Sequence, residues 1–273
     1  ILARFAQAHG LPSLTIATLR LGLAALIITP LALWQSGHTL RALTRQQGLL
    51  TVGAGFFLAL HFATWITSLE YTSVASSTAL VTTNLLWIGI ASFVLFGDRP
   101  SRLMAVGIAI SITGSGLIFW SDSRHSAPGS NPLLGNFLAV VGSWCFSAYL
   151  LIGRRLRASL PLPAYVWLAY GSAAIFLLLA CQASGTPLTG YSNAAYVVAL
   201  GLAIGPQLLG HSAYNWSLKH VSATFIAVVT LGEPVGSALL AWMFFGEAFA
   251  LLQGTGFVLL LVGIYLAARG EGG

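Results

Sequence analysis

The chain has 273 residues, of which 57% are hydrophobic and only 7% are charged. Soluble globular domains carry roughly a quarter charged residues, so this composition and a mean hydropathy of +0.85 exclude that class. The net charge of +6 comes from cations in short loops between apolar runs. Such a pattern orients a protein in a membrane, so we expect the lipid bilayer, and no nucleic acid, as its partner.

Nine apolar runs each have the roughly 20 residues that a helix needs to cross the hydrocarbon core. They cover 13–34, 48–68, 74–96, 101–120, 133–153, 163–182, 194–218, 222–245 and 250–268. Strands of a membrane β-barrel would be about half as long and would alternate apolar with polar residues. The predicted fold class is therefore all-α, a polytopic membrane helix bundle.

The two halves of the chain match each other without a gap at a constant offset of 149 residues. Ser68-Leu69-Glu70 matches Ser217-Leu218-Lys219, and Phe96-Gly97-Asp98 matches Phe245-Gly246-Glu247. Residues 1–8 resemble the end of another helix, so we expect ten helices, with most of the first one preceding Ile1. The predicted domains are a five-helix repeat over 1–120 with a truncated first helix, a linker loop over 121–132 and a second five-helix repeat over 133–273.

Most cations fall in loops on one side of the predicted membrane. These are Arg41, Arg45, Arg99, Arg102, Arg154, Arg155, Arg157, Lys219 and Arg269. The other side has only Arg4 and Arg124, so the positive-inside rule predicts that both termini are cytoplasmic. Homologous loops then lie on opposite faces, which makes the repeats inverted around a central cavity. Inverted repeats are typical of secondary transporters.

Polar residues inside the bilayer are costly and are therefore candidates for function. The candidate substrate-binding residues are His61, Trp65, Asn84, Trp87, Trp144, His211, Tyr214 and Glu233. His61 and Trp65 lie one helical turn apart, and His211 and Tyr214 form a similar stripe in the second half. A lone intramembrane histidine usually bonds a neighbouring carbonyl, but two of them beside aromatic rings favour a shared cavity. No third ligand has suitable spacing, so we expect no metal site.

Asn84 and Glu233 occupy equivalent positions in the two halves. Glu233 precedes Pro234, which removes a backbone hydrogen bond. Glu233 is then either an amine-binding or protonatable carboxylate, or part of a structural kink. Arg20 is expected either to extend to the membrane interface or to pair with a carboxylate such as Glu233.

Two further patterns concern aromatic rings and small residues within the predicted helices. Trp87 and Trp144 lie deep in their helices rather than at the interfacial belt, and such rings can stack on a flat substrate or hold a cation. The spacings Gly201-x-x-x-Gly205 and Gly232-x-x-x-Gly236 predict close helix contacts.

Several segments together resemble the EamA-like branch of the drug/metabolite transporter superfamily. They are Leu11-Pro12, Thr18-Leu19-Arg20, the Ser68–Thr72 turn, Leu218–Ala223, and Glu233-Pro234 followed by Phe244-Phe245-Gly246-Glu247. Within this branch, His61 and the buried tryptophans resemble the YddG-like aromatic amino-acid exporters. The resemblance implies a helix basket with alternating access that exports amino acids or cationic toxic compounds. The chain departs from the pattern at Asn84-Leu85, where the first half lacks Glu-Pro.

The leading hypothesis is an inner-membrane amino-acid exporter for aromatic or bulky apolar substrates, and a monomer. The alternative is a lipophilic-cation exporter that couples to protons through Glu233. A nucleotide-sugar transporter is disfavoured because anionic substrates need a cation at mid-depth, and only Arg20 qualifies. An intramembrane enzyme is disfavoured because no paired Asp, Ser/His or zinc motif is present. No phosphate loop or other cofactor motif occurs, so we expect no cofactor.

Overall fold

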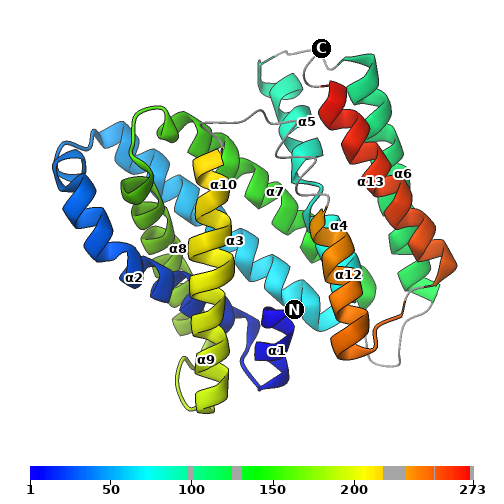
Figure 1. Cartoon of the computed structure of the whole chain (residues 1–273), viewed down its shortest axis with the longest axis horizontal. Coiled ribbons are helices and arrows are strands. Elements are labelled where there is room, and N and C mark those ends of the chain that lie inside the picture. The colour runs from blue at the N-terminus through cyan, green and yellow to red at the C-terminus, as the bar shows by residue number, and fades with distance from the viewer. Residues whose placement is uncertain (97–100, 125–130, 218–231, 249, 271–273) are drawn as a thin grey trace. The chain divides into compact units, whose positions relative to one another are not determined.

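The regular elements of the protein are helices throughout the part of the chain that the structure describes (Figure 1). The structure is a computed structural model, and it describes residues 1–96, 101–124, 131–217, 232–248 and 250–270. The helices are α1 (Leu2–Ala8), α2 (Ser13–Arg41), α3 (Arg45–Tyr71), α4 (Val74–Val81), α5 (Asn84–Phe96), α6 (Arg102–Arg124), α7 (Pro132–Arg157), α8 (Leu162–Ser184), α9 (Asn193–Leu202), η1 (Ala203–His211), α10 (Ser212–Ser217), α12 (Gly232–Phe245) and α13 (Leu251–Gly270). The predicted all-α fold class is confirmed.

Seven of the described segments are long and apolar enough to cross a membrane. They correspond to seven of the nine predicted runs, and two shorter apolar segments, Val74–Ile88 and Glu233–Phe245, correspond to the other two. Residues 222–231 of the predicted 222–245 run lie outside the described residues. The chain is therefore a polytopic helical membrane protein.

Two of the predicted runs are not simple helices. The run 74–96 is interrupted at Thr82 and Thr83, which separate α4 from α5. The run 194–218 comprises α9, the π-helical segment η1 in the middle, which contains Pro206, and α10. Proline lacks an N–H and cannot continue the ordinary hydrogen-bond ladder, so a wider turn follows locally. Helix α6 also extends to Arg124, four residues beyond its predicted end.

The chain folds as two compact units. The first unit contains Ile1, residues 67–147 and residues 221–273, and the second unit contains residues 2–66 and 148–220. Each unit draws segments from both halves of the sequence. Charge is divided between them as well, because all six acidic residues of the chain fall in the ranges of the first unit.

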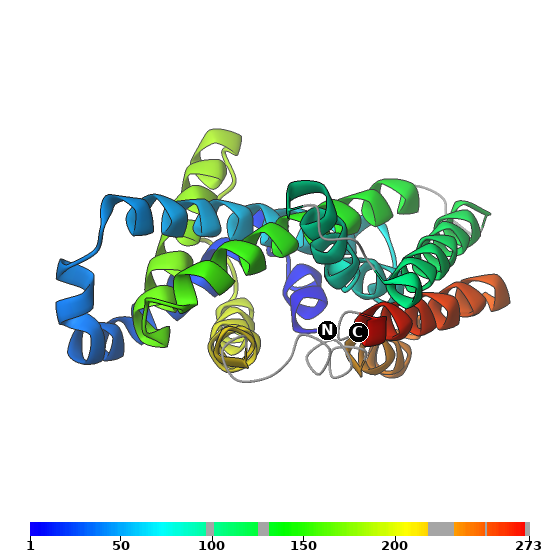
Figure 2. The same cartoon turned by 90° about the horizontal axis from the view of Figure 1, so that it is seen from above.

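Helices α6 and α13 form the closest pair of the first unit, and both views show them side by side (Figures 1 and 2). A Cβ on Gly114 would lie 2.5 Å from the Leu260 nitrogen and 2.7 Å from the Gly256 oxygen. Gly107 is equally close to the backbone at Gly263. The later glycine of α6 meets the earlier glycine of α13, so the two helices are antiparallel. Glycine is required at these positions because backbone occupies the place of a side chain.

A buried polar network connects α4, α6, α7 and α13 in the first unit. The Asp122 carboxylate accepts hydrogen bonds from Asn136 Nδ2 over 2.6 Å and from Gln253 Nε2 over 2.7 Å. Gln253 Nε2 lies 2.8 Å from Ser76 Oγ, and Thr72 Oγ1 donates to Asn136 Oδ1 over 2.7 Å. Buried polar groups are stable when they are paired in this way, so the network fixes the ends of these helices together.

The second unit is organised around the antiparallel pair α2 and α8. The hydroxyl of Thr18 lies 3.3 Å from the Cys181 sulfur, and Trp167 Nε1 donates to Thr29 Oγ1 over 2.8 Å. Helix α3 packs on α8 at Gly55, where a Cβ would clash with Ser172. The spacing Gly201-x-x-x-Gly205 does not make the predicted contact with described residues, since nothing lies within 4 Å of either Cβ position. The same holds for Gly236.

Candidate substrate-binding residues

Four of the predicted site residues lie in the second unit, and three of them meet in one aromatic cluster. The ring of His61 stacks on Trp65 with centroids 5.8 Å apart and an interplanar angle of 13°. The His211 ring lies 6.2 Å from His61 and 5.1 Å from Phe62, which completes the cluster. The fourth residue, Tyr214, is half-buried in α10. The two histidines are therefore neighbours, as predicted, and Phe62 contacts both of their rings.

Arg20 belongs to the same cluster, although it was expected at the membrane interface or beside a carboxylate. Its side chain is only 2% exposed, so the interface prediction is wrong. The guanidinium lies 4.1 Å above the centroid of Phe62 and 5.9 Å from Trp65, within the range of cation–π attraction. Its Nε donates to Gln207 Oε1 over 2.7 Å. A permanent cation is thus held between aromatic rings and an amide.

Local hydrogen bonds explain how η1 and α10 place their side chains. Asn215 Nδ2 donates to the carbonyl oxygen of His211 over 2.9 Å, and the Tyr149 hydroxyl lies 3.0 Å from Asn215 Oδ1. The hydroxyl of Tyr170 lies 3.1 Å from Ser212 Oγ. Buried hydroxyls and amides need such partners. These bonds attach the segment that carries Gln207 and His211 to α7 and α8.

The charge of the second unit sets the chemistry of this cluster. Residues 2–66 and 148–220 contain eight arginine or lysine residues and no aspartate or glutamate. A guanidinium offers N–H donors in a planar fork that matches a carboxylate. The cluster therefore combines a group suited to a carboxylate with ring faces suited to an apolar or aromatic side chain.

Three predicted site residues lie in the first unit, around the break between α4 and α5. The rings of Trp87 and Trp144 meet edge to face with centroids 5.3 Å apart. Trp87 Nε1 donates to Thr83 Oγ1 over 3.0 Å, and the Thr83 hydroxyl lies 3.0 Å from that of Ser143. Asn84 is buried, and its backbone oxygen accepts a hydrogen bond from Ser147. An interrupted membrane helix exposes backbone groups that often line a binding site.

The two tryptophans differ in how far they are buried. Trp87 is half-buried, whereas Trp144 is 43% exposed. Glu233, the remaining candidate of the first unit, is exposed in the first turn of α12, and Pro234 beside it is buried. Glu233 takes part in an interaction of its own.

Two features of the structure, the burial of Arg20 and the position of Asp122, do not follow from the sequence pattern. Arg20 was a weak candidate because its position in the helix fits a structural role equally well, and only burial separates the two. Asp122 was assigned to a loop because the apolar run stops at Trp120. The sequence gives no signal for this extension, because aspartate has a low helix propensity and an acidic side chain is unfavourable in the last turn of a helix.

Comparison with known proteins identifies the family. The EamA-like transporter family matches residues 1–120 and 133–269. The chain belongs to this family. Among EamA-like relatives, an uncharacterized transporter of Archaeoglobus fulgidus is 23% identical over 97% of this chain and 90% of its own length. The uncharacterized transporter YyaM of Bacillus subtilis is 20% identical over 98% of this chain and 88% of its own.

The fold of this EamA-like chain is also found among solved structures. A crystal structure that is 18% identical covers 97% of this chain and 90% of its own, with a TM-score of 0.69. The relatives place the chain among membrane transporters of small molecules rather than among enzymes.

Proposed function

We propose that this EamA-like protein exports amino acids, with a preference for aromatic or bulky apolar side chains, by alternating access. The observation that carries the proposal is the cluster of Arg20, His61, Phe62, Trp65 and His211 in the second unit. The guanidinium and the ring faces suit the two parts of such a substrate, its α-carboxylate and its side chain. The α-carboxylate binds the guanidinium, and the side chain stacks on the rings.

Selectivity follows from the energies of these contacts. A hydrogen bond to a charged group contributes about 1.5–3 kcal/mol, and an aromatic pair contributes about 0.5–1.5 kcal/mol beyond its buried area. Every amino acid offers the carboxylate, whereas only some offer an aromatic or bulky apolar side chain, so the rings give the preference among amino acids. Asn84, Trp87, Trp144 and Glu233 of the first unit, and Tyr214 of the second, remain candidate substrate-binding residues, each within its own unit.

Export of a lipophilic cation is the second candidate, and Glu233 is the observation that favours it. Glu233 is an exposed carboxylate in the first turn of a membrane helix. Such a group can exchange a proton for a cation. The positive charge of the second unit opposes this alternative, because a cation that approached Arg20 would be repelled.

Flux into proteoliposomes tests the proposal directly. Radiolabelled Phe, Trp, Thr and methyl viologen are each offered to the reconstituted protein, with and without a pH gradient. We expect Phe and Trp to move faster than Thr and to compete with each other. If methyl viologen moves in a proton-dependent way and no amino acid moves or competes, the amino-acid proposal is rejected in favour of the second candidate.

A pair of tryptophan variants tests the role of the rings. Trp65→Leu removes the ring that stacks on His61 and should weaken competition by Phe about two- to tenfold, with a smaller effect on Thr. Trp216→Leu is the matched control, because Trp216 lies in α10 and is half exposed. Equal losses for Phe and Thr in Trp65→Leu would show that the ring is structural.

A further inference from the structure

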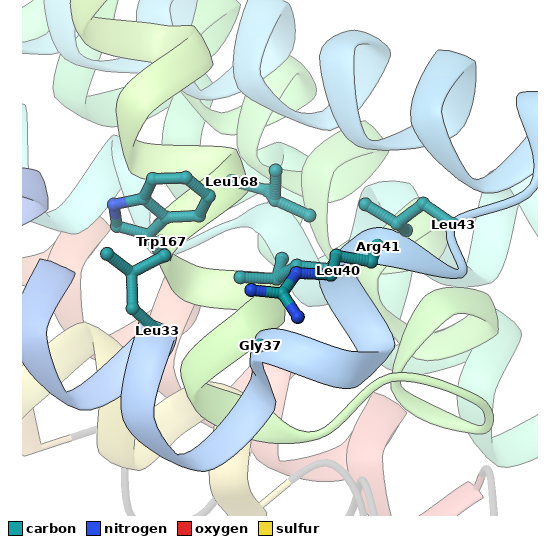
Figure 3. Close-up of a pocket in the computed structure, with 7 residues that line it drawn as sticks. All are labelled: Leu33, Gly37, Leu40, Arg41, Leu43, Trp167 and Leu168. Carbon is teal, nitrogen blue, oxygen red and sulfur yellow. The ribbon is translucent and has the colours of Figure 1, made fainter.

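A cavity lies in the second unit, at the end where α2 finishes and α8 begins. It has a volume of about 400 Å³ and is lined by Leu33, Gly37, Leu40, Arg41, Leu43, Trp167 and Leu168 (Figure 3). Six of these seven residues are apolar or glycine, and Arg41 is the charged one. The lining is therefore a hydrocarbon wall with one cation.

Figure 3 shows how the cation is placed. The side chain of Arg41 extends back along α2 from its last turn, so that its guanidinium lies among the lining residues rather than away from them. Gly37 leaves open space beside the guanidinium, because no described atom lies within 4 Å of the Cβ position of Gly37. Trp167 on the opposite helix is held by its hydrogen bond to Thr29. Trp167 and the leucines form the apolar part of the lining.

The surroundings of the cavity are strongly cationic. Gln47 Nε2 at the start of α3 donates to Ser159 Oγ in the α7–α8 loop over 3.1 Å. The start of α3 and the α7–α8 loop therefore lie at the same end of the unit. Exposed Arg45 begins α3, and exposed Arg154 and Arg155 lie in the last turn of α7, just before that loop. The ranges of the second unit contain no acidic residue that would offset them. The positive-inside rule assigns this end to the cytoplasmic leaflet.

We infer that this cavity binds an anionic phospholipid, with its phosphodiester on Arg41 and part of an acyl chain against Leu33, Gly37 and Trp167. The membrane supplies such a molecule from the adjacent leaflet, and basic pockets between membrane helices are suited to anionic headgroups. A soluble anion would use only Arg41. A phospholipid also uses the apolar wall, and its occupancy would hold α2 and α8 together. The site is independent of the proposed transport function.

Lipid binding is measured on the purified full chain by native mass spectrometry, with phosphatidylglycerol and phosphatidylcholine as probes. We expect the wild type to retain phosphatidylglycerol in preference. Arg41→Gln should lower retained phosphatidylglycerol about fivefold, which is the effect of one cation at an anionic surface. Gly37→Leu should lower it as well, since the new side chain fills the space for the acyl chain without altering any charge.

Two matched controls separate a built site from general attraction. Arg45→Gln removes a neighbouring charge that does not line the cavity, and Gly22→Leu makes the same substitution on α2 at another open position. Gly22→Leu should retain the wild-type amount of phosphatidylglycerol, and Arg45→Gln should lose less of it than Arg41→Gln does. Equal losses in Arg41→Gln and Arg45→Gln, or no loss in Gly37→Leu, would overturn the inference. Displacement by inorganic phosphate alone would also overturn it, because the acyl chain would then play no part.

Discussion

Arg20 is the residue on which the proposed chemistry depends most. Its guanidinium is always charged, and burial of a charge is costly unless compensating contacts are made. The ring of Phe62 and the amide of Gln207 supply such contacts. The same contacts aim the cation at the cluster that contains His61 and His211. Structural and substrate-binding roles are compatible here, so a test must distinguish them.

Comparison of two ligands makes that distinction. Arg20→Gln should weaken binding of phenylalanine by about tenfold or more, since one charge-assisted hydrogen bond is lost. Phenylalaninamide lacks the carboxylate and carries a net positive charge, so its binding should be unchanged or improved. Competition with labelled Phe in proteoliposomes measures both.

The control for this experiment is Arg45→Gln, which removes an exposed cation outside the cluster. It should leave the ratio between the two ligands as in the wild type. A parallel loss of both ligands in Arg20→Gln, together with a lower melting temperature, would assign Arg20 a structural role alone.

At the scale of elements, the pair α6 and α13 connects the sequence repeat to the packing. Gly107 and Gly114 are equivalent to Gly256 and Gly263, and in the structure Gly107 meets Gly263 while Gly114 meets Gly256. Ser111 Oγ contacts the Leu260 oxygen over 3.4 Å, and these two residues are 149 positions apart. A residue meets its own equivalent only where a two-fold axis passes. This geometry supports the proposal that the two halves are inverted repeats.

A single methyl group should test the closeness of this pair. Gly114→Ala places a Cβ against the backbone of Leu260 and should lower the free energy of unfolding by about 1–3 kcal/mol, the usual cost of overpacking. Gly116→Ala lies on the same helix with no described atom within 4 Å of its Cβ position. It should be neutral or slightly stabilising, because alanine favours a helix.

Unfolding of both variants in detergent with increasing SDS gives the measurement. The predicted sign differs between the two glycines, so a general effect of alanine cannot produce the result. Equal stability of Gly114→Ala and Gly116→Ala would show that the close approach of α6 and α13 is absent from the folded protein.

For the whole molecule, the two compact units do not coincide with the two sequence repeats. Each unit takes matching segments from both halves, such as α2 with α8 and α6 with α13. The contacts that define each unit therefore join equivalent helices of the two halves over 1–120 and 133–273. All acids belong to the first unit and most cations to the second, so their chemical roles differ as well.

The orientation in the membrane is a prediction at the same scale. Ser159 lies in the α7–α8 loop and Thr189 in the α8–α9 loop, and both are exposed. In a chain in which Cys145 and Cys181 are replaced, Thr189→Cys should react in intact cells with a maleimide that does not cross the membrane. Ser159→Cys should react only after the membrane is opened. The reverse pattern would contradict cytoplasmic termini, whereas equal labelling of both would contradict a membrane-spanning α8.

The sequence by itself determined the membrane class and the helical fold, because apolar runs of about 20 residues span lipid only as helices. Its motif segments also indicated the family. It also indicated that His61 and His211 are neighbours, since the repeat places them at equivalent depth. It could not determine whether Arg20 is buried, that α4 and α5 are separate helices, or that Asp122 lies within a hydrogen-bonded network. Those properties depend on which distant side chains fill the space around each group. Only the tertiary structure supplies Gln207 to Arg20, Ser143 to Thr83, and Asn136 and Gln253 to Asp122.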